Sequence, residues 1–169
     1  MQHIWTCRCC GKQYDTLPMS YGAPAPDPAL AIGEGEVGTR VRLSSDACII
    51  DDKHFFVLGC LEIPVDQCPD RFVWNVWVSV SEKSFQRIEA LWDVDLRDAE
   101  PPFFGWLCTQ LPIYPPTLNL KTSVHLRNHG IRPLIRLEPT DHPLAVEQRD
   151  GIALQRVEEI AALLSLHNQ

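Results

Sequence analysis

The clearest hydrophobic pattern in the chain lies between Phe72 and Ser81, where apolar side chains recur at every second position. Such alternation is typical of a β-strand with one face in a core. The face that carries Trp74 is apolar throughout, whereas Trp77 shares its face with Asn and Ser residues. The pattern predicts a central strand whose Trp74 face is buried. Trp77 then belongs either to a covered part of the sheet or to a ligand-binding platform.

Shorter patterns of the same kind predict further strands, and helical spacing predicts two helices. The expected strands cover 41–43, 48–50, 54–65, 103–111, 121–127 and 131–137, and the expected helices follow Ser81 and cover 152–166. Gly130 suits the turn of a hairpin between the last two strands. Strands that mostly follow one another, with helices set apart, predict an α+β fold in which a mainly antiparallel sheet is covered by helices.

The stretch before these elements is rich in proline and excludes long regular structure. Four prolines lie between Leu17 and Gly38, so we expect an irregular arm with one helical turn near 29–32. A length of 169 residues suits one sizeable core. The sequence therefore predicts a single domain, 1–169, in which a cysteine cluster and Pro-rich arm (1–38) pack on an α+β core (39–169).

Composition and charge narrow the classes of protein and partner. No apolar run reaches about 20 residues and the N-terminus lacks the pattern of a signal peptide, so we expect a cytoplasmic protein without a membrane segment. The formal net charge of −7 repels a polyphosphate backbone. Nonspecific binding of nucleic acid is therefore not expected.

Six short motifs, spread over nearly the whole chain, give it a resemblance to a bacterial family catalogued as domain of unknown function 2199. The motifs are Cys7-x-x-Cys10-Gly11 with Leu17-Pro18, Leu43-x-x-Asp46-x-Cys48-x-Ile50-Asp51, Trp77-Val78-Ser79-Val80-Ser81, Phe104-Gly105-Trp106-Leu107, Leu111-Pro112-x-Tyr114-Pro115 and His142-Pro143-Leu144-Ala145-x-Glu147-Gln148. The resemblance implies a full-length domain but no activity. The family often has a histidine where this chain has Tyr14, so the resemblance does not bring a complete metal site.

Cys7 and Cys10 have the spacing of half a zinc site, with Gly11 permitting the tight turn. Zinc needs four ligands, and Cys48 and His142 are candidates for the others; His54, Cys60 and Cys68 are further alternatives. The competing interpretation is that the cysteines are reduced thiols at a turn or in the core. A redox pair would need a helix after the motif, which the glycine and the prolines disfavour.

Two other arrangements could carry catalysis. His142 and Glu147 could form a general acid/base pair, although a histidine before proline often only caps a helix. Cys48 with Asp51 and His54 could form a nucleophile site, but apolar neighbours favour burial of this cysteine. No phosphate loop, nucleophile elbow or metalloprotease helix is present in the sequence.

Basic residues without acidic neighbours gather between Pro101 and Leu137, a segment that contains no Asp or Glu. Alternation in the expected hairpin places basic side chains on common faces, so a basic plate could form there. Either the plate is neutralised by the protein's own acids, such as those of 93–100, or it receives an anionic small ligand or an acidic protein. The candidate binding residues are Trp77, His125, Arg127, Arg132 and Arg136.

Three functions remain as hypotheses at this point. The first is a non-catalytic binding or interaction domain, because the chain offers aromatic and basic surfaces but no complete catalytic set. The alternative is a small hydrolase that depends on a metal or on His142 and carboxylates. A further alternative, by analogy alone, is immunity to a secreted toxin, which suits a small acidic cytoplasmic bacterial protein.

Overall fold

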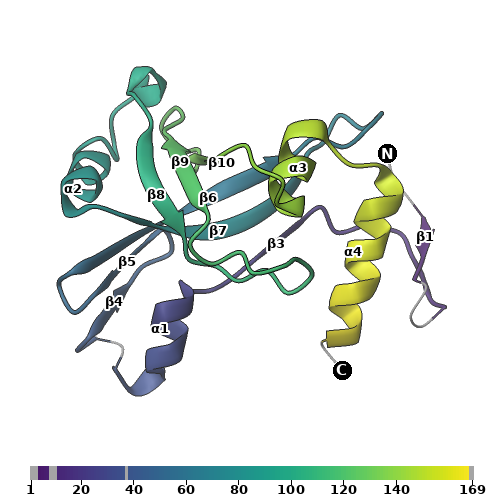
Figure 1. Ribbon diagram of the computed structural model, residues 1–169, viewed down its shortest axis with the longest axis horizontal. Coiled ribbons are helices and arrows are strands. Elements are labelled where there is room, and N and C mark those ends of the chain that lie inside the picture. The colour runs from purple at the N-terminus through teal and green to yellow at the C-terminus, as the bar shows by residue number, and fades with distance from the viewer. Residues whose placement is uncertain (1–3, 8–10, 37, 168–169) are drawn as a thin grey trace.

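The computed structural model describes residues 4–7, 11–36 and 38–167, and most of its strands join one sheet of eight (Figure 1). The strands are β1 (Trp5–Thr6), β2 (Gln13–Tyr14), β3 (Ser20–Gly22), β4 (Val41–Leu43), β5 (Ala47–Ile50), β6 (His54–Ile63), β7 (Phe72–Val80), β8 (Phe103–Leu107), β9 (Lys121–His125) and β10 (Leu134–Leu137). The helices are α1 (Asp27–Ile32), α2 (Glu82–Ala90), α3 (Pro143–Asp150) and α4 (Leu154–His167), with 3-10 turns at Glu34–Glu36 and Arg97–Ala99.

Five strands of the large sheet form a closed barrel. They follow in the order β6-β7-β8-β9-β10, each antiparallel to the next, and β10 then pairs with β6. In a ring of five strands that alternate in direction, the first and the last run the same way. The closing pair is accordingly parallel, with Leu134 opposite Cys60. The remaining strands of the sheet, β3, β5 and β4, extend it beyond the barrel.

The expected α+β architecture, a mainly antiparallel sheet covered by helices, is wrong. The sheet closes on itself, so the inner faces of the barrel strands face one another, and residues of α2, α3 and α4 only add to the core that the strands enclose. Helices lie outside this ring, as Figure 1 shows for α1, α2 and α4. Even the expected Pro-rich arm contributes a strand, because β3 pairs in parallel with β7.

Alternation along β7 fills the barrel as the sequence predicts. Phe72 and Trp74 are 0% and 2% exposed and belong to the main core. The barrel is narrow enough that Gly59, in the middle of β6, faces the side chain of Ile135 on β10. A Cβ at Gly59 would lie 2.5 Å from both Cγ1 and Cδ1 of Ile135. Glycine therefore makes room for the strand that closes the ring.

A second, smaller core covers the other face of β6 and β7. The β4–β5 hairpin and α1 lie over this face, and Cys48 and Cys108 are buried in the contact. Trp77 is 1% exposed there, and its Nε1 donates a hydrogen bond to the carbonyl of Ala23 at 3.0 Å. Of the two environments predicted for Trp77, the structure therefore shows the covered part of the sheet.

Helix α3 lies where β10 diverges from β6. There the side-chain amide of Gln148 hydrogen-bonds the backbone of β10, as a neighbouring strand would. Gln148 Nε2 donates to the carbonyl of Ile135 at 2.7 Å, and its Oε1 accepts from the backbone N–H of Leu137 at 2.8 Å. Glu147 accepts from the hydroxyl of Tyr114 at 2.6 Å and pairs with Arg156 at 2.9 Å. These contacts join α3 to the barrel and to α4.

Replacing Gln148 with leucine should lower the free energy of unfolding by about 1–2 kcal/mol, because a side chain of similar size would leave two backbone groups of β10 without partners. Urea denaturation of the purified variant measures the change. Gln86→Leu on the exposed face of α2 is the matched control and should alter stability by less than about 0.5 kcal/mol. Equal stability of the two variants would mean that water replaces the amide.

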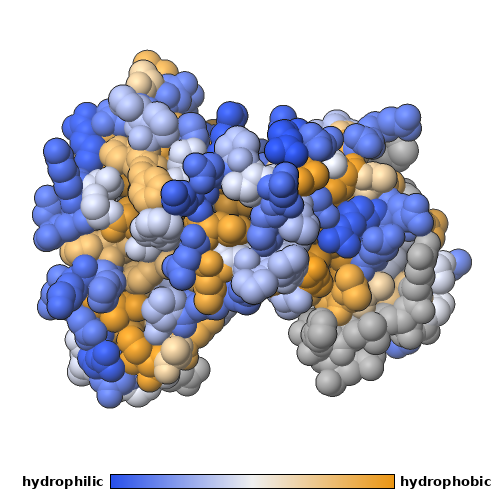
Figure 2. All heavy atoms as spheres, viewed as in Figure 1, coloured by the Kyte–Doolittle hydropathy of each residue, from blue (hydrophilic) through white to orange (hydrophobic). Residues whose placement is uncertain are grey.

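The N-terminal and C-terminal segments pack together at one end of the molecule. Trp5 of β1 and Ala161 of α4 are buried against each other with Cys7. Figure 2 shows a notch in the lower outline between this end and the part that contains α1. None of the helices in the described part of the chain is long and apolar enough to cross a lipid bilayer.

Candidate functional site

A cavity of about 600 Å³ opens where the outer edge of β6 changes its strand partner. The N–H of Leu58 donates to the carbonyl of Asp46 at 3.0 Å, next to β5, whereas the N–H of Cys60 donates to the carbonyl of Pro133 at 2.8 Å, just before β10. β5 and β10 part at this point, so Asp46 and Arg132 meet across the gap. The cavity therefore results from the divergence of β5 and β10 along β6.

The wall of this cavity is strongly basic. Arg97, Arg127, Arg132 and His129 line it, whereas Asp46 is its acidic lining residue. Trp92 and Cys60 complete much of the remaining surface. We call this hollow the first cavity. On a chain with a formal net charge of −7, it is a local concentration of positive charge.

Arg97 is 5% exposed and holds the loop between β9 and β10 in place. Its Nε donates to the carbonyl of Arg127 at 2.6 Å and its Nη2 to that of Ile131 at 3.2 Å, while Nη1 donates to the carbonyls of Leu91 and Trp92. Among the described residues, no carboxylate forms an ion pair with this guanidinium. Arg97 therefore fixes both ends of the loop and adds an unneutralised charge beside the first cavity.

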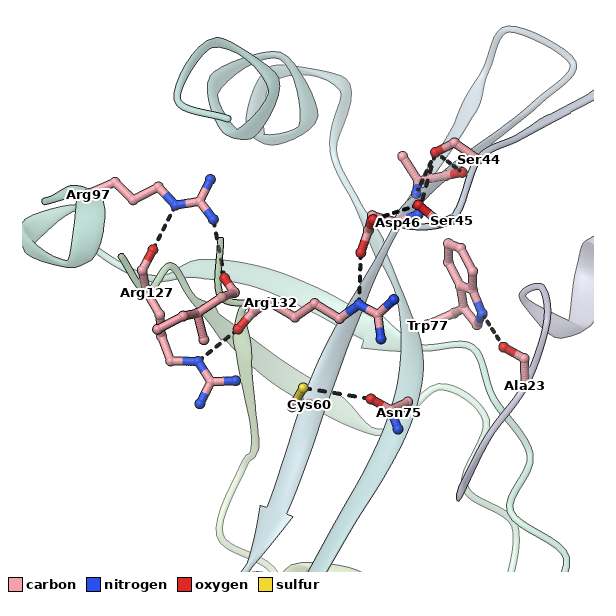
Figure 3. Close-up of polar contacts among 12 residues, drawn as sticks. Ala23, Ser44, Ser45, Asp46, Cys60, Asn75, Trp77, Arg97, Arg127 and Arg132 are labelled. Atoms are coloured by element: carbon pink, nitrogen blue, oxygen red, sulfur yellow. Dashed lines mark hydrogen bonds and ion pairs between the residues drawn. The ribbon is translucent and has the colours of Figure 1, made fainter. Parts of the chain in front are cut away.

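Arg127 and Arg132 leave this loop toward β6, and each meets one carboxylate of the protein. Arg132 Nε donates to Asp46 at 2.8 Å, and Arg127 Nη1 pairs with Glu62. Figure 3 shows the long side chain of Arg132 reaching over Cys60 toward Asp46. Within the described chain, the two terminal nitrogens of Arg132 make no hydrogen bond. They can therefore donate to a ligand in the first cavity.

Asp46 is held as an anion in this arrangement. Burial acts to raise the pKa of its carboxyl, but hydrogen bonds from Arg132 and Ser45 outweigh burial, so the pKa lies below its ordinary value. The negative charge keeps Arg132 extended across the gap. A ligand carboxylate would thus meet an arginine that is already oriented.

Cys60 lines the first cavity but is not an activated nucleophile. Burial raises the pKa of its thiol, and the neighbouring Arg127 and Arg132 only partly oppose this effect. The thiol donates to Oδ1 of Asn75 at 3.7 Å. It stays protonated near neutral pH, which disfavours attack on a substrate.

The other predicted binding residues lie apart from the first cavity. His125 and Arg136 are on the outer face of the barrel, where Ser123 Oγ lies 2.8 Å from Nε2 of His125. Burial lowers the pKa of His125, and the charge of Arg136 adds to this effect. Trp77 is buried in the second core. The structure therefore brings Arg127 and Arg132 together at one cavity and leaves Arg136 beside another hollow.

The residues proposed for zinc do not converge where they are described. Cys10 lies outside the described residues, so the Cys7 and Cys10 pair stays a prediction. Cys48 lies in β5 and Cys7 follows β1, at opposite ends of Figure 1. Residues 4–7, 11–36 and 38–167 contain no group of three or more His, Cys, Asp or Glu side chains arranged to hold a metal ion.

His142 and Glu147 both have structural partners. His142 caps α3, because its Nδ1 accepts from the N–H of Leu144 at 3.1 Å, while its Nε2 lies 3.1 Å from the carbonyl of Pro116. Glu147 is engaged by Tyr114 and Arg156. These contacts occupy the groups that a His142-dependent hydrolase would require.

Sequence reasoning missed Arg97 and the carboxylates of the site. Arg97 stands in a stretch that reads as acidic, and its burial depends on the distant carbonyls of Arg127 and Ile131. The acids near it form no ion pair with the three arginines of the first cavity among the described residues. Asp93 and Asp95 lie 3.6 and 3.7 Å from His129, and Glu100 pairs with Arg87, which lies outside that cavity. A lone arginine within an acidic loop is the signal that could have identified Arg97.

Comparison with protein families gives one match. Residues 6–152 match the model of a family described as "Uncharacterized protein conserved in bacteria (DUF2199)". Neither the curated proteins nor the solved structures gave a match.

Proposed function

The chain belongs to this family of uncharacterised bacterial proteins, whose description names no activity. We propose that it is a non-catalytic binding domain whose first cavity receives carboxylate groups. The carboxylates could belong to an acidic protein or to an anionic small ligand. Two ion pairs within the protein support this chemistry, since Arg127 and Arg132 already hold carboxylates in hydrogen-bonding geometry.

One observation carries the proposal: the cavity holds three arginines and one carboxylate, and one of these arginines is buried without any acidic partner among the described residues. A buried cation raises the positive potential of the water-filled space beside it. An anion that enters this space is stabilised electrostatically by the charge of Arg97 and does not need a hydrogen bond from it. The same anion can form charge-assisted hydrogen bonds with Arg132.

We assign this function to the cytoplasm. Cys48, Cys60, Cys68 and Cys108 carry free thiols. Free thiols are characteristic of proteins that work in a reducing compartment.

Reversing the charge of Arg127 and Arg132 to glutamate should weaken binding of a fluorescein-labelled hexaglutamate peptide by about tenfold or more, because charge-assisted hydrogen bonds are lost and repulsion replaces them. Fluorescence anisotropy measures the dissociation constant. Raising NaCl from about 50 to about 300 mM should weaken binding to the unaltered protein, because salt screens exposed charges.

Lys83→Glu is the matched control, since Lys83 is exposed near the start of α2 and lines neither this cavity nor the one described below. Thermal melts establish whether each variant folds. If the variant with both charge reversals does not fold, Arg132→Gln replaces it in the binding assay. Binding that is indifferent to the reversal and to salt would refute the proposal.

A further inference from the structure

A second cavity of about 490 Å³ lies on the same outer face of the barrel. Its lining includes Glu62 of β6, Leu134 and Arg136 of β10, and the side chains of Arg71 and Arg149. It is therefore lined by three arginines and one carboxylate, the same proportion as the first cavity.

The arginines of this second cavity are weakly neutralised. Arg71 lies 3.9 Å from Glu62, and Arg149 pairs at 3.3 Å with its exposed chain neighbour Asp150. Exposed pairs of this kind contribute little to stability. Arg136 is exposed and forms no ion pair with any residue that the structure describes. These side chains can turn toward an anion at small cost.

One ion pair joins the linings of the two cavities. Arg127 lines the first cavity, its partner Glu62 lines the second, and the two side chains are bonded to each other. Along β6, Cys60 faces the first cavity and Glu62 the second. Cys60 and Glu62 are about 7 Å apart along the strand, so the two basic hollows adjoin each other along β6.

Building on the proposed function, we propose that the two cavities are subsites of one groove, which binds an extended acidic peptide segment. In an extended peptide, side chains at alternate positions point the same way and are about 7 Å apart. Acidic side chains at such positions would enter the first and second cavities in turn. The Arg127–Glu62 pair lies beneath the peptide between them.

A peptide suits this groove better than a nucleic acid. The formal net charge of −7 repels a long polyphosphate chain at a distance, whereas a short acidic segment meets mainly the local arginines. No aromatic ring stands among the described residues that line the second cavity, so it offers no surface on which a base could stack. The guanidinium groups already bind carboxylates within the protein.

The test uses three labelled heptapeptides of Ser and Glu. One has glutamates at alternate positions, one has the same number in an adjacent cluster, and one has a single glutamate. Fluorescence anisotropy compares the unaltered protein with Arg132→Glu in the first cavity, Arg136→Glu in the second and Lys83→Glu in neither. Arg136 is a suitable position because its side chain is exposed and forms no ion pair within residues 4–7, 11–36 and 38–167.

We expect the alternating peptide to bind about tenfold more tightly than the single-glutamate peptide and more tightly than the clustered one, because it fills both subsites. Arg132→Glu and Arg136→Glu should each remove most of this advantage, and Lys83→Glu should not.

Three results would contradict the proposal that the two cavities form one peptide-binding groove. If Arg132→Glu weakens binding but Arg136→Glu behaves like Lys83→Glu, the second cavity is no subsite, although the first cavity keeps its proposed function. If the clustered peptide binds as well as the alternating one, the extended arrangement is wrong. If a single-stranded oligonucleotide of equal charge competes more strongly than the alternating peptide, the ligand is a nucleic acid.

Discussion

Replacing Trp74 with alanine should lower the free energy of unfolding by about 3–5 kcal/mol, as deletions of large buried aromatic side chains do. The indole is 2% exposed and sits among three aromatic rings, with the centroid of Phe72 at 5.0 Å, that of Tyr21 at 5.6 Å and that of Tyr114 at 6.0 Å. Its Nε1 also donates to the hydroxyl of Tyr114 at 3.2 Å. The deletion removes packing and a hydrogen bond together.

Thermal and urea denaturation measure this loss, and Trp106→Ala provides the control. Trp106 is 41% exposed on the outer face of β8, so its deletion should change stability by less than about 1 kcal/mol. If both tryptophan deletions had equal effects, the assignment of the two faces of the barrel wall would be incorrect.

Gly59→Ala should cost about 3 kcal/mol, although it adds only one methyl group. The new Cβ would lie 2.5 Å from two carbons of Ile135, and Ile135 is 0% exposed, so its side chain can give way only by displacing other core atoms. Backbone closes the other side, since the carbonyl of Pro133 is 3.0 Å from the same position. Overpacking of this kind forces strain into the surrounding structure.

Two further variants separate steric conflict from loss of glycine. Gly35→Ala should be nearly neutral, because a Cβ at Gly35 meets no atom within 4 Å. Combining Gly59→Ala with Ile135→Ala should be less destabilising than the sum of the two single changes, because the methyl group then occupies the vacated space. Additive losses in urea denaturation would rule out the steric explanation.

Local patterns predicted much of the secondary structure. The faces of β7 follow from alternation within one strand, and Ser81 caps α2 by accepting from the N–H of Ser84 at 3.1 Å. Both features depend on residues close in sequence. The closed barrel does not, because it requires Leu134 to lie beside Cys60, and no pattern within either segment specifies a partner so far along the chain.

The candidate site could likewise be predicted only in part from the sequence. Arg127, Arg132 and Arg136 could be identified from a basic stretch without acids, and two of them line one cavity. The carboxylate partners of Arg132 and Arg127 lie outside that stretch: Asp46 is in the turn before β5, and Glu62 is in β6. Because an ion pair depends on where side chains meet in space, composition could show an excess of positive charge but not which acids neutralise it.

The parallel pair that closes the barrel also sets an order of events during synthesis on the ribosome. β6 to β9 can pair with one another as each emerges, but β10 comes last and contributes the closing contact opposite Cys60. Until it arrives, the nascent sheet has one unpaired edge along β9 and another along the second half of β6. Such edges can recruit strands from other chains. Any delay in the docking of β10 between β9 and β6 would therefore prolong the period in which both edges of the newly made sheet are open.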